Sequence, residues 1–205
     1  LTIDNKKTFN LIISIIESEG YDVSWWVLDS KDYGVPQTRR RVFIYGSLKK
    51  NKNTFPIDPP KITRKILTTR SVLEKNVDKK YILSEKILKT ILKHGTGGYY
   101  SKSEIDLEIA RPLTRTMVKM HRANQDNYYS NKFILNEKKL KWVRKLTPLE
   151  ALRLQGFPDR FYQNAKNIPI SDAQMYMQAG NSVTTNVVEA ILSHLIKHEW
   201  FYDYY

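Results

Sequence analysis

The stretch TFNLIISIIESEGYDVSWWVLDSKDYGVPQTRRRVFIYG, residues Thr8–Gly46, decides the fold. Apolar side chains recur at helical spacing over residues 8–19 and predict a helix, which Gly20 ends. The segments Tyr21–Leu28 and Arg41–Tyr45 are rich in β-prone residues and predict two strands. The loop between them contains glycine and proline, which exclude a regular element there. Helix, strand, loop and strand in this order predict the trailing part of an α/β layer.

The length and composition of the chain limit the number of domains and indicate the kind of partner. Its 205 residues suffice for one generous domain or two small ones, and 41% hydrophobic residues can fill a core. The 34 Lys and Arg against 21 Asp and Glu give a net charge of +13, which points to an anionic partner such as nucleic acid. The alternative explanation of this charge is a general bias toward lysine in the composition. The chain has no cysteine, which excludes a disulfide scaffold and a cysteine nucleophile of its own.

Three features concern location and metal binding. No run approaches the roughly 20 apolar residues of a membrane helix, and no secretory signal pattern begins the chain, so we expect a cytoplasmic protein without a membrane partner. Leu1 in place of Met favours upstream sequence that was cut away or left out. His194 and His198 have the spacing that can clip a metal ion. They lack an evident third ligand, so exposed helix-end histidines are preferred and no metal is predicted.

The middle and the last third of the chain differ in composition and in predicted secondary structure. Residues 49–102 hold 14 Lys and Arg against 4 Asp and Glu, and prolines near their start predict a linker or domain crossing. One helix is predicted there, over Ser84–His94. Residues 103–140 are polar and predict little helix. Regular structure returns with TPLE, a capping-box pattern at Thr147 that starts a helix. Two more helices are then predicted, Ser171–Ala179 and Thr184–Lys197.

The basic run at residues 37–41 is the strongest local indication of a ligand site. On an extended chain alternate residues share a face, so Gln37, Arg39 and Arg41 are expected to point the same way. Guanidinium groups on one face suit a phosphate or a base-edge oxygen, because each offers a planar fork of donors. A solvated cluster of charges is the alternative.

Three stretches occur in the order of the motifs of one known family. They are DYGVPQTRRRVFIYG (Asp32–Gly46), RKLTPLEALRLQGFPDRF (Arg144–Phe161) and QAGNSVTTNVVEAI (Gln178–Ile191). They resemble motifs VIII, IX and X of the cytosine-5 DNA methyltransferases of restriction–modification systems, and Lys7–Val23 is similar to motif VII. The resemblance implies an α/β fold, with a partial Rossmann-like methyltransferase layer and an irregular mixed target-recognition domain.

The resemblance also implies a division of the chain into three segments. Residues 1–47 correspond to the C-terminal part of the catalytic domain, and residues 48–143 to the target-recognition domain. Residues 144–205 correspond to motifs IX and X, which return to the catalytic domain. The excess of basic residues falls at the start of the middle segment, where the prolines also lie.

Roles for individual residues follow from the same resemblance. Arg39 and Arg41 match positions that contact the flipped cytosine and a nearby phosphate, and Gln37 is expected to be structural or to assist at the DNA. Part of the pocket for the cofactor S-adenosylmethionine is expected from Asn181, Ser182 and Val183. An enzyme that flips a base at one specific site also needs a segment that reads the flanking bases. We expect such DNA contacts from Arg111, Thr114, Arg115, Thr116, Lys119, His121, Arg122, Asn124 and Asn127, with an ordinary irregular loop as the alternative.

The family's remaining motifs are absent from this chain. Its cofactor glycine motif, its Pro-Cys nucleophile loop and its Glu-Asn-Val motif all precede motif VII. Without a cysteine to attack carbon 6, the chain alone is predicted to transfer no methyl group. We therefore expect the C-terminal portion of a DNA (cytosine-5-)-methyltransferase, with double-stranded DNA and the missing N-terminal part or subunit as partners. The alternative is a non-catalytic DNA-binding subunit that completes a split methyltransferase.

Overall fold

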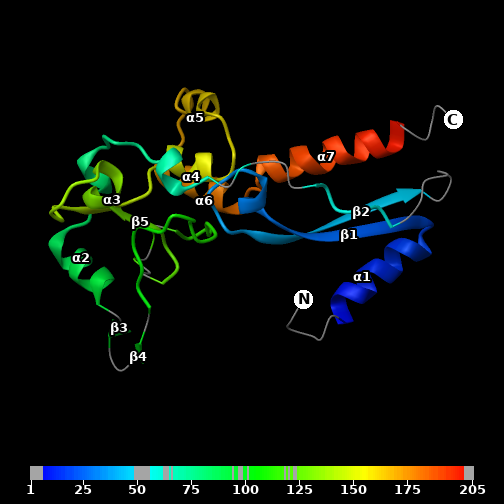
Figure 1. Cartoon of the computed structure of the whole chain (residues 1–205), viewed down its shortest axis with the longest axis horizontal. Helices are drawn as coiled ribbons and strands as arrows, with labels where there is room; N and C mark the ends of the chain where they lie inside the picture. Colours follow the sequence, from blue (N-terminus) through cyan, green and yellow to red (C-terminus); the bar gives the residue numbers. More distant parts are fainter. Residues whose placement is uncertain are drawn as a thin grey trace. The chain divides into compact units, whose positions relative to one another are not determined.

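The structure is a computed structural model that combines helices with small sheets, and the predicted α/β class is confirmed (Figure 1). It describes residues 7–48, 56–61, 65, 67–93, 95–96, 99–100, 102–117, 119, 121 and 124–200. The chain forms two compact units. Unit 1 contains residues 1–28, 40–62 and 189–205, and unit 2 contains residues 29–39 and 63–188.

Unit 1 is built on a two-stranded sheet. It contains α1 (Lys7–Ser18), most of β1 (Tyr21–Asp29), β2 (Arg40–Leu48) and most of α7 (Thr185–Trp200). The side chains of β1 alternate, because successive residues of a strand point to opposite faces. Ser24, Trp26 and Leu28 are buried, whereas Trp25 and Val27 are exposed. β2 is longer than predicted, because Gly46 continues the strand instead of ending it.

The segment at residues 56–61 is hydrogen-bonded to the buried face of β1. Ile57 N donates to Ser24 Oγ at 2.7 Å, and Trp26 Nε1 donates to Ile57 O at 2.9 Å. His194 on α7 is half-buried, and its Nε2 lies 2.8 Å from Asp58 O. This histidine therefore contacts backbone, whereas the side chain of His198 lies outside the described residues. Among the described residues no group of three potential ligands is placed to hold a metal ion.

Unit 2 contains short helices and two small antiparallel sheets. Its α-helices are α2 (Glu85–Leu92), α3 (Asn131–Leu135), α4 (Pro148–Leu154), α5 (Asp159–Ala165) and α6 (Asp172–Asn181). Its 3₁₀ turns are η1 (Ser30–Tyr33), η2 (Thr69–Ser71) and η3 (Lys79–Tyr81). β3 (Gly95–Thr96) pairs with β4 (Tyr99–Tyr100), and β5 (Tyr128–Ser130) pairs with β6 (Val143–Lys145). In the second sheet Tyr128 lies opposite Lys145.

One buried apolar cluster joins the elements of unit 2. It includes Leu113 and Met117 from the segment before β5, Leu152 and Leu154 from α4, and Tyr176 from α6. The hydroxyl of Tyr176 donates to a backbone carbonyl, that of Leu146, at 2.5 Å. Burial raises the pKa of this hydroxyl, so it remains a neutral donor near pH 7. The cluster therefore holds α4, α6 and the segment before β5 in one core.

The start of α4 matches its sequence prediction and adds an ion pair. Thr147 Oγ1 accepts from Glu150 N at 3.2 Å, and Thr147 N donates to the Glu150 carboxylate at 2.8 Å, which is the predicted capping box. The same carboxylate accepts two hydrogen bonds from the Arg144 guanidinium, at 2.8 and 2.6 Å. Both side chains are 0% exposed. Buried charges of this kind persist only when they are paired, so the pair fixes β6 against α4.

Some element bounds differ from the sequence prediction. α6 continues through Gly180 to Asn181 instead of ending before the glycine. The glycine has a packing role inside the helix, described below. α2 is shorter than the predicted range 84–94, whereas α3 and α5 were not predicted. No helix among the described residues is long and apolar enough to cross a bilayer.

Candidate functional site

The loop at residues 29–39 folds back on itself at the edge of unit 2. Asp29 Oδ1 accepts a hydrogen bond from Arg39 N at 2.8 Å, and Ser30 N donates to Arg39 O at 3.3 Å. Gly34 follows η1 with a φ of +84°, a left-handed conformation that glycine adopts without strain. These contacts bring the two ends of the loop together and set the positions of Gln37 and Arg39.

Gln37 is fully buried, and backbone groups occupy its side-chain amide. Its Nε2 donates to Leu154 O at 2.8 Å, and its Oε1 accepts from Leu113 N at 2.8 Å. The backbone beside it is paired as well, since Thr38 N donates to Ala110 O at 3.0 Å. Gln37 therefore ties this loop to the end of α4 and to residues 110–113, and its amide faces protein rather than solvent.

Arg39 joins three segments through one guanidinium group. The side chain is 6% exposed. Its Nη1 donates to Leu113 O at 2.9 Å, and its Nη2 donates to Gly180 O at 2.9 Å and Ser182 O at 3.0 Å. The planar fork suits this task, because its donors diverge in fixed directions. In this arrangement these donors face backbone carbonyls.

Arg41 differs from Gln37 and Arg39, contrary to the expectation that all three share one face. It lies in β2 and is exposed, and its Nη1 donates to the carbonyl of Arg40 at 2.8 Å. Gln37 and Arg39 are buried, whereas the first three residues of β2, Arg40 to Val42, are all exposed. Arg41 therefore presents its guanidinium to solvent, where it is accessible to an anion.

The end of α6 carries the three residues expected to contact the cofactor. Asn181 and Val183 are exposed, with 50% of Val183 accessible. Ser182 is half-buried, and its Oγ donates to Ala179 O at 2.9 Å. The turn therefore places a polar amide and an apolar side chain at the surface, while Ser182 stabilises the end of the helix.

Gly180 allows the backbone at Thr114 and Arg115 to approach this turn. A Cβ at this position would clash with the carbonyl of Thr114 and lie 2.7 Å from Arg115 N. Since only glycine lacks a Cβ, close approach of the two backbones requires it here. Together with Arg39, Gly180 holds the start of the recognition segment against the end of α6.

A chain of neutral hydrogen bonds links the three motif regions. Gln155 Nε2 donates to Ala179 O at 2.9 Å, and its Oε1 accepts from Thr184 Oγ1 at 3.0 Å. Thr184 Oγ1 is also 2.8 Å from Ser30 Oγ. Gln155 is fully buried, so these partners replace the water that its amide loses on folding. The network connects residues of motifs IX and X with Ser30, which lies just before motif VIII, without using a charge.

Residues 111–127, here named the recognition loop, are closed at their base by two side chains. Arg111 N donates to Asn127 Oδ1 at 2.8 Å, and Asn127 Nδ2 donates to Arg111 O at 3.1 Å. The Arg111 guanidinium also contacts Glu104, by hydrogen bonds of 3.0 Å to its carbonyl and 3.2 Å to its carboxylate. In this structure the side chains of Arg111 and Asn127 form hydrogen bonds within the protein, and these bonds hold the base of the loop together.

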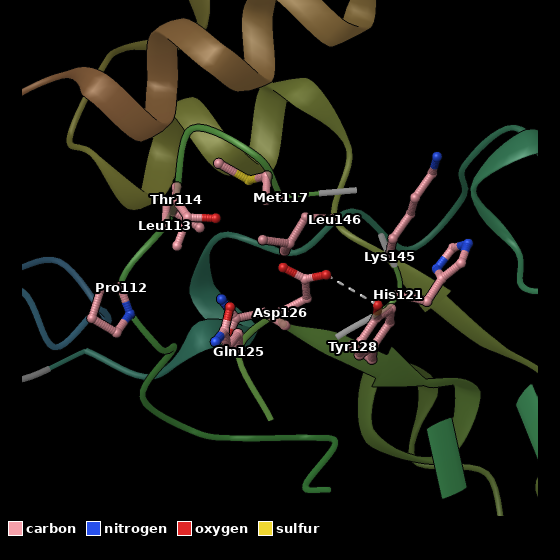
Figure 2. A pocket seen from close by; sticks show the side chains of 11 residues that line it. Pro112, Leu113, Thr114, Met117, His121, Gln125, Asp126, Tyr128, Lys145 and Leu146 are labelled. Carbon is pink, nitrogen blue, oxygen red and sulfur yellow. Dashed lines mark hydrogen bonds between the residues drawn. The ribbon is translucent and has the colours of Figure 1, made fainter. Parts of the chain in front are cut away.

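The remaining predicted DNA contacts lie along this loop. Four of them are exposed: Arg115, Thr116, Lys119 and Asn124. Thr114 and His121 are half-buried and line a small hollow inside the loop, whereas Arg122 lies outside the described residues (Figure 2). The loop thus offers cations and polar groups at its surface and a partly apolar hollow within.

Burial dominates the electrostatics of the hollow. It raises the pKa of the Tyr128 hydroxyl well above its usual range, and the neighbouring Asp126 carboxylate adds to the effect. Burial also lowers the pKa of Lys145, which lines the hollow, while Asp172 partly opposes this shift. Tyr128 is therefore a neutral donor near pH 7, and its hydroxyl donates to Asp126 Oδ2 at 3.3 Å.

Comparison with known proteins identifies the family. The sequence profile of C-5 cytosine-specific DNA methylases matches residues 1–197. The chain belongs to this methylase family. Its relatives include the Type II methyltransferase M.SsoII of Shigella sonnei, 34% identical over 206 residues, and M.DsaV of Dactylococcopsis salina, 31% identical over 202 residues. The matches cover 94% and 95% of this chain but 49% and 53% of those proteins, so the methylase chain spans about half their length.

The methylase fold is also seen in solved structures. The Dnmt2 methyltransferase of S. pombe superposes with a TM-score of 0.73 at 18% sequence identity, covering 95% of this chain and 64% of that one. This likeness confirms the expected methyltransferase fold. The three functional segments at 1–47, 48–143 and 144–205 remain a prediction, and the compact units divide the chain at other places.

Sequence reasoning missed several contributors to the candidate site. The sequence prediction assigned Arg144 no partner. Its partner is Glu150, six residues later, whose carboxylate can accept more hydrogen bonds than the capping box uses. Asn127 was expected to face DNA rather than to close the recognition loop. Asp126 and Tyr128 were not singled out, because their sequence neighbourhood shows no sign of the hollow that they line.

Proposed function

We propose that this chain supplies target recognition, cytosine and phosphate contacts and part of the cofactor pocket of a DNA (cytosine-5-)-methyltransferase. The complete enzyme would transfer a methyl group from S-adenosylmethionine to cytosine in a specific duplex site. Family membership over residues 1–197 supports the reaction class. The observation that carries the proposal is the Arg39 guanidinium, which binds the recognition loop at Leu113 and the α6 turn at Gly180 and Ser182.

This connection has a direct mechanistic use. An enzyme that acts on carbon 5 of a stacked base must extrude the base while it holds the flanking sequence in register. A rigid link between the recognition loop and the α6 turn would keep the site that reads bases at a fixed distance from the reacting base. Arg41, exposed on β2, is suited to a phosphate contact, since its guanidinium is accessible.

The residues at the end of α6 fit part of a pocket for S-adenosylmethionine. The exposed Asn181 amide offers donors and an acceptor, and the exposed Val183 side chain offers an apolar contact. A ligand with polar edges and a flat apolar ring needs both. When bound, the cofactor supplies the methyl group, and in our proposal these residues only hold and orient it.

A partner polypeptide is required by the proposal, because the nucleophilic cysteine must come from outside these 205 residues. The surface of unit 1 supports this partner. None of the residues of α1 is buried, and its exposed side chains include Leu11, Ile12 and Ile15. The sheet adds Trp25, Val27, Val42 and Ile44. Apolar exposure of this extent in one unit is typical of a protein that another chain or segment covers.

Duplex binding tests the recognition role. The chain is mixed with a library of randomised duplexes, and the bound fraction is sequenced at two salt concentrations. We expect one preferred sequence and an affinity that falls steeply with salt, since lysine and arginine contacts to phosphate release counterions. Equal binding of all sequences would contradict target recognition by this chain.

The second candidate function is a non-catalytic subunit that completes a split methyltransferase. The exposed apolar surface of unit 1 favours it as much as it favours a single interrupted polypeptide. A chain that binds no duplex until a polypeptide with the family's missing motifs is added would support this completion role over independent DNA reading.

A further inference from the structure

The recognition loop encloses a hollow that the proposed function does not yet use (Figure 2). The loop is closed at its base by the two hydrogen bonds between Arg111 and Asn127. Its two arms therefore face each other, and β5 and β6 contribute Tyr128 and Lys145 to the lining. The hollow is formed entirely by residues of unit 2, within the segment expected to meet DNA bases.

The walls of the hollow differ in chemistry. Leu113, Met117 and Leu146 provide a buried apolar wall. Asp126 provides an acceptor: its carboxylate is part of a side chain only 7% exposed and accepts from Tyr128 at 3.3 Å. A carboxylate has about four lone-pair sites, so it can accept further hydrogen bonds. In Figure 2 the Asp126 carboxylate lies near Leu146 and is joined by a dashed line to Tyr128, and the Lys145 side chain extends away from it.

His121 lines the hollow and carries an enclosed polar atom. Its Nδ1 is enclosed and has no hydrogen-bond partner among the described residues. Enclosed polar atoms in folded proteins are nearly always hydrogen-bonded, so one without a partner requires a specific explanation. A group that enters from DNA, or a water molecule in its absence, would supply the partner.

The size of the hollow restricts what can enter. Its volume is about 10 Å³, which is room for one group of the size of a water molecule. A single substituent on the edge of a base fits this space. Beside a carboxylate, this substituent must be a hydrogen-bond donor, because a carbonyl oxygen would be repelled.

We propose that the hollow receives the exocyclic amino group of one base in the recognised duplex, N4 of cytosine or N6 of adenine. Asp126 accepts its N–H, and His121 is part of the lining of the same hollow, so both are expected to determine specificity at that position. Thymine and guanine present carbonyl oxygens in the major groove and are rejected there. This inference rests on the proposed function, since it names the chemistry by which the recognition loop selects a base.

Base analogues without the amino group test the proposal. The preferred duplex is first selected with the 205-residue chain, and each cytosine or adenine is then replaced in turn by 2-pyrimidinone or purine. Fluorescence anisotropy gives the Kd of each duplex. We expect about a tenfold loss of affinity at one position, and the base at that position distinguishes cytosine from adenine.

Variants assign this loss to the hollow. In Asp126→Asn the analogue should cost less than about threefold at that position, because the acceptor is already weakened. Glu108→Gln is the matched control: it removes one carboxylate from an exposed side chain outside the hollow and should keep the tenfold loss. If Asp126→Asn does not fold, His121→Ala gives the second reading, with the same reduced loss expected.

Three results would overturn the inference. They are the absence of any position sensitive to the amino group, an unchanged analogue loss in Asp126→Asn, and an unchanged loss in His121→Ala. The first of these would mean that the hollow holds only water. A parent chain without any sequence preference would instead contradict the proposed function, so the two failures are distinguishable.

Discussion

One guanidinium carries an unusual share of the contacts in unit 2. Arg39 donates to carbonyls of the recognition loop and of the end of α6, and its removal takes a donor from each of these three carbonyls. We expect Arg39→Ala to lower the free energy of unfolding by about 3 kcal/mol. Urea denaturation followed by circular dichroism measures the change.

Arg41→Ala is the control for that experiment. The Arg41 side chain is exposed, so its loss should change stability by less than about 0.5 kcal/mol. Equal stability losses in the two variants would contradict the structural role assigned to Arg39.

Gly180 provides a second test at the scale of a single residue. A Cβ there would clash with the Thr114 carbonyl, so Gly180→Ala must displace the recognition loop or the end of α6. Overpacking of this kind should cost about 1–3 kcal/mol, measured as a loss of unfolding free energy. Gly46→Ala serves as the control, because its Cβ would meet only ordinary contacts at 3.5 Å. A neutral Gly180→Ala variant would disprove the close approach.

At the scale of elements, the Arg144–Glu150 pair fixes the start of α4. Removal of one partner leaves a charge buried without compensation. Glu150→Ala is therefore expected to lower the unfolding free energy by about 3–5 kcal/mol. Thr147→Ala, which removes the capping hydroxyl and its 2.6 Å hydrogen bond to the Glu74 carboxylate, should cost about 1–2 kcal/mol. Similar losses in both variants would show that the ion pair contributes little.

The start of α6 should give unit 2 a dependence on acidic pH. Burial raises the pKa of Asp172, but hydrogen bonds from Lys80 and Tyr81, at 2.7 and 2.8 Å, outweigh it and lower the pKa below its usual 3.8. Because the folded pKa is the lower one, this stabilisation is present above about pH 4 and is lost as the pH falls through the folded value.

Asp172→Asn tests this linkage through the melting temperature between about pH 2 and 7. The variant should be less stable than the parent at pH 7, by under about 1 kcal/mol because the pair is partly exposed, and the two should converge in acid. A difference that stays constant over the whole range would contradict the assignment.

Elements with local causes could be predicted from the sequence, whereas contacts between elements could not. The capping box at Thr147 and the helix end at Gly20 depend on neighbouring residues. α6 is longer than predicted because Gly180 continues the helix instead of ending it. The reason for a glycine there is the backbone at Thr114, about 66 residues earlier in the chain, which a Cβ would meet. Likewise, Gln37 and Arg39 were predicted as ligand-facing, although their partners at Leu113 and Gly180 become visible only in the folded unit.

For the whole molecule, the family and fold followed from ordered motifs, but the compact units did not. Residues 29–39 belong to unit 2 because their hydrogen-bond partners lie at residues 110–113 and 154–186. A division by amino-acid composition alone places residues 29–39 with the helix and strands at the start of the chain. Long-range hydrogen bonds, rather than composition, therefore determine which segments pack together.

The absence of cysteine makes the central claim directly testable by methyl transfer. The purified chain is incubated with its preferred duplex and S-adenosylmethionine labelled in the methyl group, alone and with a polypeptide that carries the family's glycine, Pro-Cys and Glu-Asn-Val motifs. A mixture in which the partner's cysteine is replaced by serine is the control. We predict label in DNA only with the intact partner; label transferred by the chain alone would contradict the account.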